Sequence, residues 1–312
     1  MPDLHHRIVG ANGVRLHLAE RGSGPLVLFC HGFPETWWSW RHQLEALAEA
    51  GYHAVAVDMR GYGESERPPA IDQYTLFHLV GDMVGVLDAL GEAQAVIVGH
   101  DWGAPVAWHA ALMRPDRFRA VAGLSMPYRP RGKSRPTTAM PRTEGAMFYQ
   151  LYFQAPGVAE AELQRDVAAS MRTILTGGFD GRDPTAIPGM VRDGQGFLDG
   201  MKVKPELPSW LAQSELDVFV ESFEASGFAG GLNWYRNIDR NWELLAPFTG
   251  APVTVPALYM AGDKDLVVRF PGMMKAIEGL KRDVPLLRET LLLPGCGHWT
   301  QQERATEVNE AL

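Results

Sequence analysis

The 312-residue sequence lacks the features that would place it in a membrane, outside the cell or on nucleic acid. It has no uninterrupted apolar run of about 18 residues, the length that crosses a bilayer. Its first residues lack the basic and apolar regions of a signal peptide. Its formal net charge is −8 and it has no stripe of Lys and Arg, which argues against nucleic acid or an anionic membrane as a partner. We therefore expect a cytoplasmic protein.

Cysteine is scarce, and neither Cys30 nor Cys296 lies in a C-x-x-C or Cys/His cluster. Both are expected to be reduced, buried residues. The ten histidines are scattered along the chain, so no metal site is predicted. The stretch 61–66 has the first two glycines of a dinucleotide-binding G-x-G-x-x-G loop but Glu66 at the third position. We expect a turn there, and no cofactor.

Apolar strands and amphipathic helices alternate over residues 7–126 and again from residue 255 onward. A hairpin is predicted over 7–20, and further strands at 26–30, 53–58, 95–98, 120–126, 255–260 and 286–293. Helices are predicted at about 40–50, 74–90, 103–113 and 271–280, and from about 302 to the end. This alternation is typical of an α/β protein, a mostly parallel twisted sheet with helices on both faces.

The pattern changes after Pro127. Between about 143 and 246 it shows helices and loops but no apolar run that is typical of a buried strand. The sequence therefore predicts an all-helical cap at 130–246, inserted into a core formed by residues 1–129 and 247–312. The glycine-rich stretch 177–181 is expected to shape the pocket.

Within the α/β part, the chain turns abruptly from a strand into a helix at Asp101. Gly99, Gly103 and Ala104 supply the small side chains that such a sharp turn requires. The layout is that of a nucleophile elbow, with Asp in place of the usual Ser. The alternative is an ordinary N-cap aspartate that accepts hydrogen bonds from helix N–H groups. These residues alone leave both interpretations open.

Two further polar residues, Asp265 and His298, also directly follow predicted strands. A carboxylate nucleophile, an acid and a histidine in this chain order match the triad of α/β hydrolases. Asp263 competes with Asp265 for the role of the acid, because both follow the same strand. Taken singly, each residue is also compatible with a solvated loop position. Their joint occurrence after successive strands favours the triad.

An aspartate at the elbow predicts a definite chemistry. A carboxylate is ionised at neutral pH and can attack an sp³ carbon without a base, which gives an ester. His298 would then activate the water that hydrolyses this ester. The oxyanion of that second step needs donors, and the candidates are the backbone N–H groups of Phe33 and Trp102.

Six motifs of the chain resemble those of epoxide hydrolases of the α/β-hydrolase superfamily, closest to the soluble type. They are H-G-F-P (31–34), G-Y-G-E-S (61–65), G-H-D-W-G (99–103), F-Y-Q-L-Y-F-Q (148–154), N-W-Y-R-N (233–237) and G-H-W-T-Q (297–301). The resemblance extends over essentially the whole chain. It implies the α/β-hydrolase fold with a cap, and an enzyme that needs no cofactor and converts small apolar epoxides and water to diols.

The resemblance also implies the roles of individual residues. Asp101 would be the nucleophile, His298 the base, and Asp265 rather than Asp263 its partner. Tyr149 and Tyr235 of the cap would hold the epoxide oxygen, and Phe33-Pro34 would be joined by a cis bond. A phenol suits this task because it can protonate the alkoxide that ring opening produces. Spacing alone does not choose between Tyr149 and Tyr152, which lie three residues apart on one helix.

Aromatic residues near these motifs suggest an apolar cleft. The residues expected to line it are Phe33, Pro34, Trp37, Trp102, Tyr152 and Trp299, although ordinary core packing explains such aromatic residues equally well. His100 is expected to be packed beneath the elbow.

Two other functions remain open at this stage. A haloalkane or fluoroacetate dehalogenase would share the triad, but Phe33 stands where haloalkane enzymes tend to have Asn, and Trp102 where fluoroacetate enzymes tend to have Arg. A non-catalytic ligand-binding protein on the same scaffold would be expected to have lost a triad or tyrosine residue, and none is lost. The sequence leaves the oligomeric state, including a homodimer, open.

Overall fold

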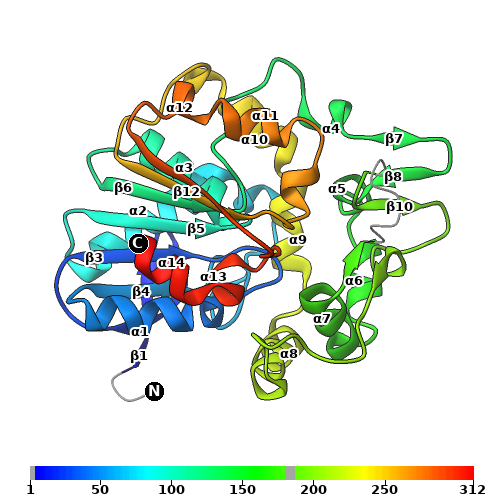
Figure 1. Ribbon diagram of the computed structural model, residues 1–312, viewed down its shortest axis with the longest axis horizontal. Coiled ribbons are helices and arrows are strands. Elements are labelled where there is room, and N and C mark those ends of the chain that lie inside the picture. Colours follow the sequence, from blue (N-terminus) through cyan, green and yellow to red (C-terminus); the bar gives the residue numbers. More distant parts are fainter. Residues whose placement is uncertain (1–3, 180–186) are drawn as a thin grey trace.

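The computed structural model describes residues 4–179 and 187–312 of the chain. The glycine-rich stretch 177–181 therefore lies partly outside the described residues. The molecule divides into a part that contains the large sheet and a mainly helical part beside it (Figure 1). Within the described residues, no helix combines the length and the apolarity that crossing a bilayer requires.

The described part of the chain forms one large sheet of eight strands in the order β1-β2-β4-β3-β5-β6-β12-β13. The β1/β2 and β2/β4 pairs are antiparallel and the other pairs are parallel, which confirms the predicted mostly parallel sheet. The strands are β1 (His5–Ala11), β2 (Val14–Arg21), β3 (Leu26–Cys30), β4 (His53–Val57), β5 (Ala95–His100), β6 (Phe118–Leu124), β12 (Ala257–Gly262) and β13 (Leu287–Leu293).

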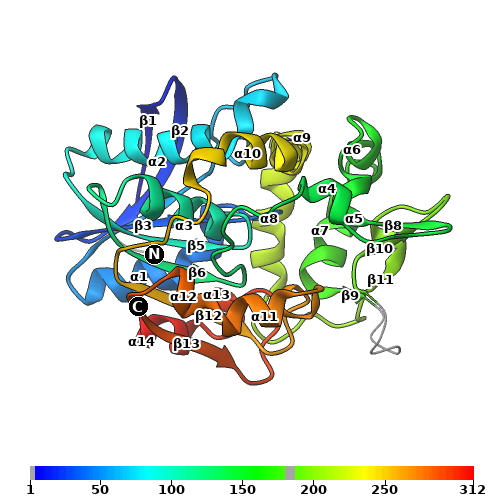
Figure 2. The ribbon, with the colours of Figure 1, turned by 90° about the horizontal axis from the view of Figure 1, so that it is seen from above.

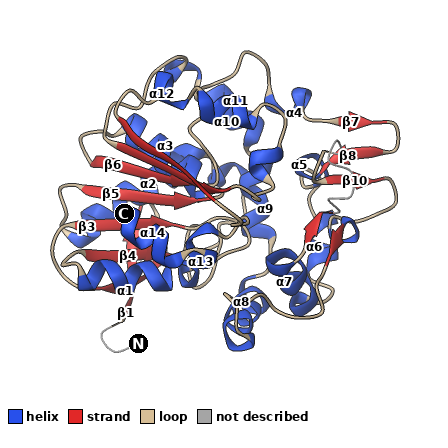
Figure 3. Ribbon diagram, viewed as in Figure 1, coloured by secondary structure: helices blue, strands red, loops and turns tan. Residues whose placement is uncertain are grey.

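Helices cover both faces of this sheet, with α2 and α3 on one side and α1 and α14 on the other (Figure 2). Figure 3 shows the same layering by element type. The helices of this part are α1 (Arg41–Glu49), α2 (Leu76–Leu90), α3 (Gly103–Met113), α11 (Met273–Glu278), α12 (Leu280–Asp283), α13 (Thr300–Glu303) and α14 (Ala305–Ala311). The predicted closing helix is therefore broken in two, and 3-10 helices η1 (Trp37–Trp40), η2 (Ile71–Tyr74) and η5 (Val267–Arg269) precede α1, α2 and α11.

The alternation of side chains along a strand explains why the central strands are apolar throughout. In β3, Leu26, Leu28 and Cys30 join the core on the α2/α3 face. Val27 and Phe29 join a second core on the α1/α14 face. A strand that is buried on both sides needs apolar residues at every position, which is the pattern of a parallel sheet. Cys30 and Cys296 are free and buried, as predicted.

The insertion between β6 and β12 is mainly helical, but the prediction of an all-helical cap needs correction. Its helices are α4 (Pro136–Ala139), α5 (Tyr149–Tyr152), α6 (Val158–Leu163), α7 (Val167–Thr176), α8 (Gln213–Ser226), α9 (Ala229–Arg236) and α10 (Ile238–Leu244), with η3 (Leu198–Gly200) and η4 (Ala246–Phe248). It also holds a sheet of β7 (Arg142–Thr143), β8 (Ala146–Phe148) and β10 (Met190–Arg192), and a pair of β9 (Gly178–Phe179) and β11 (Met201–Lys202). Strands of two or three residues are too short to produce a readable alternation.

Helix α9 is the part of the insertion that docks most closely on the core, and it stands between the sheet and the rest of the cap (Figure 1). Trp234 Nε1 donates to the main-chain oxygen of Arg60 at 3.1 Å. Gly230 of α9 meets Gly61 of the core so closely that a Cβ on either glycine would collide with the other's backbone. Just after α9, Asn237 Nδ2 donates to the main-chain oxygen of Ile71 at 2.6 Å. The helix is thereby fixed in place over the carboxyl ends of the strands.

Candidate active site

Asp101 stands at the sharp turn between β5 and α3, in the left-handed region with φ of 48°. Only small residues permit this turn. A Cβ on Gly99 would collide with the main chain of Gly103, and a Cβ on Gly103 with the main-chain oxygen of Cys30. A Cβ on Gly32 would strike the Asp101 side chain itself. The turn therefore presents the Asp101 side chain at the carboxyl end of β5, beside the Phe33 loop.

The two oxygens of the Asp101 carboxylate have different surroundings. Oδ1 accepts a hydrogen bond from the Phe33 N–H at 2.9 Å, and the main chain of Trp102 also hydrogen-bonds this carboxylate. Oδ2 lies 3.7 Å from His298 Nε2. Burial raises the pKa of Asp101, and the facing His298 only partly offsets this effect. Oδ1 is thus held by the Phe33 N–H while Oδ2 faces the histidine.

His298 is oriented by Asp265. His298 Nδ1 lies 2.9 Å from Asp265 Oδ1, which also accepts the Val267 N–H at 2.9 Å. Burial alone would raise the pKa of the Asp265 carboxyl, but His298 outweighs it and the pKa is lowered. Burial likewise opposes protonation of His298, yet Asp265 and then Asp101 raise the pKa of His298 to about 9.

Asp263, the competing acid, does not reach the histidine. It is exposed, and its Oδ1 accepts the Gly295 N–H at 2.7 Å, which closes the turn before the His298 loop. Asp265, by contrast, is fully buried. The structure thus brings Asp101, His298 and Asp265 together and leaves Asp263 outside.

A buried polar cluster beneath the site was not predicted from the sequence. His100 is fully buried, as expected, with Nδ1 2.7 Å from Glu35 Oε2 and Nε2 2.7 Å from the main-chain oxygen of His298. Glu35 also accepts from the Gly32 N–H and from Gln301. Burial would raise the pKa of Glu35, but His100 holds it at about 2. The cluster ties together the Phe33 loop, the elbow and the His298 loop, and the one sequence signal for it was the proximity of Glu35 to the H-G-F-P motif.

Tyr149 and Tyr235 approach the site from the cap. Their ring centroids are 6.0 Å apart, and the Tyr235 ring packs against Trp102 at 5.1 Å and Phe33 at 5.6 Å. Burial raises the pKa of both hydroxyls, so both remain protonated donors at neutral pH. Tyr152 points elsewhere, because its hydroxyl donates to Glu162 at 2.8 Å.

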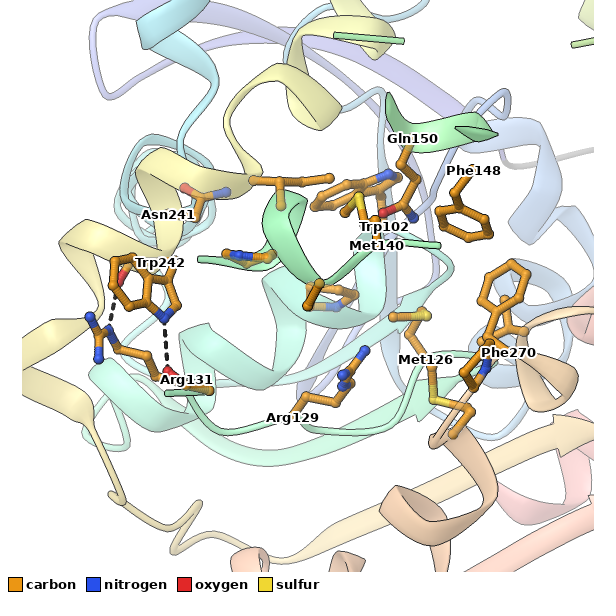
Figure 4. Close-up of a pocket in the computed structure, with 18 of the residues that line it drawn as sticks. Trp102, Met126, Arg129, Arg131, Met140, Phe148, Gln150, Asn241, Trp242 and Phe270 are labelled. Carbon is orange, nitrogen blue, oxygen red and sulfur yellow. Dashed lines mark hydrogen bonds between the residues drawn. The ribbon is translucent and has the colours of Figure 1, made fainter. Parts of the chain in front are cut away.

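A cavity of about 460 Å³ opens from Asp101 between core and cap (Figure 4). Such a volume suits a small organic molecule. Trp102 and Tyr149 line it near Asp101, with apolar walls from Met126, Met140, Phe148 and Phe270. Within the described residues, no group of three or more His, Cys, Asp or Glu side chains could hold a metal ion.

Several residues predicted to line the pocket have other contacts. Trp37 packs against His6 at the hairpin, with ring centroids 5.0 Å apart, and does not line this cavity. Trp299 is buried, with its ring centroid 4.7 Å from that of His298, and does not line the cavity. Tyr152 does not line it either. Phe33 and Pro34 are also absent from the lining of this cavity. They are joined by a cis peptide bond, as the resemblance implies, and they form the loop that delivers the Phe33 N–H to Asp101.

Comparison with known proteins agrees with this geometry. Residues 25–305 match the family model of the alpha/beta hydrolase fold. The chain is 48% identical to Epoxide hydrolase A of Mycobacterium tuberculosis, over 98% of this chain and 95% of that protein. It is 43% identical to Epoxide hydrolase 1 of Siraitia grosvenorii, over 100% of this chain and 98% of that protein.

Solved structures give the same result. The crystal structure of Epoxide Hydrolase A from Mycobacterium thermoresistibile superposes with a TM-score of 0.93 at 47% identity, covering 99% of this chain and 96% of that one. A match of this coverage includes both the sheet and the cap. The chain therefore belongs to the α/β hydrolases and, among them, to the epoxide hydrolases.

Proposed function

We propose that the protein hydrolyses small epoxides to vicinal diols through an ester formed on Asp101. The observation that carries this proposal is the asymmetry of the Asp101 carboxylate, with Oδ1 bound to the Phe33 N–H and Oδ2 facing His298. We further propose that residues 1–129 and 247–312 form the core and residues 130–246 the cap, so that the substrate lies between the two.

In the first step, Asp101 Oδ2 attacks one carbon of the epoxide and the C–O bond of the ring breaks. Tyr149 and Tyr235 donate hydrogen bonds to the departing oxygen, and one of them transfers its proton. Their raised pKa values keep them protonated until an alkoxide, a far stronger base, develops. Asp101 Oδ1 becomes the carbonyl oxygen of the ester and keeps its hydrogen bond from Phe33.

In the second step, His298 takes a proton from a water molecule that attacks the ester carbon of Asp101. The negative charge then develops on Oδ1, to which the Phe33 N–H already donates, and the Trp102 main chain hydrogen-bonds the same carboxylate. Collapse of the tetrahedral intermediate breaks the bond between the carboxyl carbon of Asp101 and Oδ2. The departing oxygen takes the proton that His298 accepted from water and becomes the second hydroxyl of the diol, and the new Asp101 carboxyl returns its own proton to His298 as it ionises. Asp265 stabilises the imidazolium that His298 becomes.

The charge of Asp101 also controls when His298 can act as a base. In the resting site Asp101 is one of the carboxylates that raise the pKa of His298 to about 9, so the imidazole is protonated at neutral pH. Esterification removes this negative charge and lowers the pKa of His298, so the imidazolium can pass its proton on to restore the tyrosine that protonated the alkoxide. The histidine therefore becomes a base once there is an ester to hydrolyse.

The decisive experiment follows oxygen during a single turnover in ¹⁸O-labelled water, with enzyme in excess over epoxide. The new oxygen of the first diol should come from unlabelled Asp101, and label should enter the diol after repeated turnovers. Label in the first diol would show direct attack by water and would overturn the ester mechanism. Asp101→Asn should abolish turnover. Incubation with a haloalkane of the same chain length as the epoxide tests the dehalogenase alternative, which predicts release of halide.

A further inference from the structure

Arg129 lines the same cavity as Asp101 but has no partner among the described residues. It follows β6, where the chain leaves the core for the cap, and its side chain points toward the middle of the cavity (Figure 4). The residue is exposed, yet surrounding protein desolvates the guanidinium and lowers the pKa of Arg129. Both properties fit a side chain that lies in a cavity open to the outside. A permanently charged group with five donors is thus left open toward whatever binds there.

The neighbouring Arg131, in contrast to Arg129, has contacts that stabilise the local structure. Its Nε donates to the main-chain oxygen of Trp242 at 2.7 Å, and its guanidinium lies 3.9 Å from the centroid of the Trp242 ring. Trp242 Nε1 in turn donates to the main-chain oxygen of Gly132 at 2.8 Å. Arg131 therefore fixes the segment after β6 to α10. Arg129 makes no such contact, so holding this segment in place does not account for its charge.

Asn241 offers a second donor on the same side of the cavity. Its Oδ1 accepts the Leu76 N–H at 2.8 Å, which fixes the orientation of the amide. The Nδ2 group is consequently turned toward the cavity, as Figure 4 shows, and has no partner in the described part of the chain. Asp101 is the one acidic residue among the described lining residues. The cavity thus has a nucleophilic carboxylate in one place, unpaired donors in another, and apolar walls around them.

We propose that Arg129, assisted by Asn241, binds a carboxylate on the substrate and so determines which epoxides the enzyme prefers. The planar fork of an arginine matches the two oxygens of a carboxylate. A monoanion balances the single charge of Arg129, whereas a phosphate dianion would leave surplus negative charge in the cavity that holds Asp101. The inference rests on the proposed function only in that the bound molecule carries an epoxide.

Binding can be tested without any reaction. A series of straight-chain alkanoates and the matching primary alkanamides, none with an epoxide, would be titrated calorimetrically into the wild-type protein and the variants. Wild type should bind a carboxylate about 10-fold or more tightly than its amide, since a charge-assisted hydrogen bond is lost in the amide. Arg129→Gln should remove this preference and Arg129→Lys should keep part of it. Arg119→Gln, which deletes an exposed arginine of β6, should retain it.

Kinetics supply the second readout. Straight-chain terminal epoxides that end in a carboxylate would be compared with the same chains ending in a primary amide. The ratio of their kcat/KM values should favour the carboxylate in wild type, mainly through KM, and fall about 10-fold or more in Arg129→Gln. Equal affinities and equal kcat/KM values for carboxylate and amide in wild type would overturn the role of Arg129 while leaving epoxide hydrolysis intact. Failure to open either epoxide, with the binding preference retained, would overturn the proposed function instead.

Discussion

Replacement of Asp101 by Asn should lower the pKa of His298. The carboxylate Oδ2 lies 3.7 Å from His298 Nε2, and the pKa of His298 is about 9 while both Asp101 and Asp265 are charged. At the 3.7 Å separation, the Coulomb energy is about 1 kcal/mol in a water-like medium and about 4.5 kcal/mol at an effective dielectric constant near 20. Removal of the charge should therefore lower the pKa by about 1 to 3 units. The pKa of His298 must fall and not rise, because the Asp101 anion stabilises the protonated imidazole.

The assay is an NMR titration of the ¹⁵N-labelled histidine rings in wild type and Asp101→Asn, with the His298 signals assigned by their loss in His298→Gln. Glu49→Gln removes an exposed carboxylate of α1 and serves as the control, with no expected shift at His298. An unchanged or raised pKa of His298 in Asp101→Asn would refute the reasoning. The histidine would then not be switched to its basic form by esterification, and another group would have to activate the water.

Two further substitutions separate the two chemical steps. Asp265→Asn should lower turnover by about 10³-fold or more, because His298 loses the carboxylate that orients it and stabilises its protonated form. Mass spectrometry of the protein after mixing with epoxide should then show the accumulated ester, and its absence would mean that Asp265 serves the first step. Tyr149→Phe and Tyr235→Phe should each slow epoxide opening, by about 10- to 100-fold, and the double variant should slow it further. Tyr152→Phe, whose hydroxyl contacts Glu162 outside the cavity, is the matched control, and an equal loss in this variant would contradict the assignment.

The sequence predicted the parts of the site that follow from chain order. Asp101 and His298 could be selected because each follows a predicted strand, and parallel strands bring their carboxyl ends to the same edge of a sheet. The glycines around Asp101 indicated the sharp turn, because a Cβ at these positions would collide with the backbone. The two-sided burial of the sheet was visible as continuous apolar strands.

Other parts depend on contacts that no local pattern contains. The preference for Asp265 over Asp263 required family resemblance, since both follow β12 and only the folded loop shows which one is buried against His298. Tyr149 and Tyr152 share one helical turn, and the difference between them lies in Glu162, which is ten residues from Tyr152. The cavity near Arg129 forms between segments more than 100 residues apart, such as the segment that follows β6 and helix α10.

Because α9 is docked on the core, the segment that could be replaced by the cap of a related enzyme is shorter than the whole insertion. Trp234 and Asn237 hydrogen-bond to the core and Gly230 packs against it, so the position of Tyr235 depends on the core surface beneath α9. A foreign cap joined at Gly227, between α8 and α9, preserves this surface, whereas a junction after α10 separates the helix from its docking partners. Tyr149 lies on the exchangeable side. Of the two tyrosines proposed to hydrogen-bond the substrate oxygen, Tyr235 is fixed to the core by the docking of α9, whereas Tyr149 is exchanged with the cap.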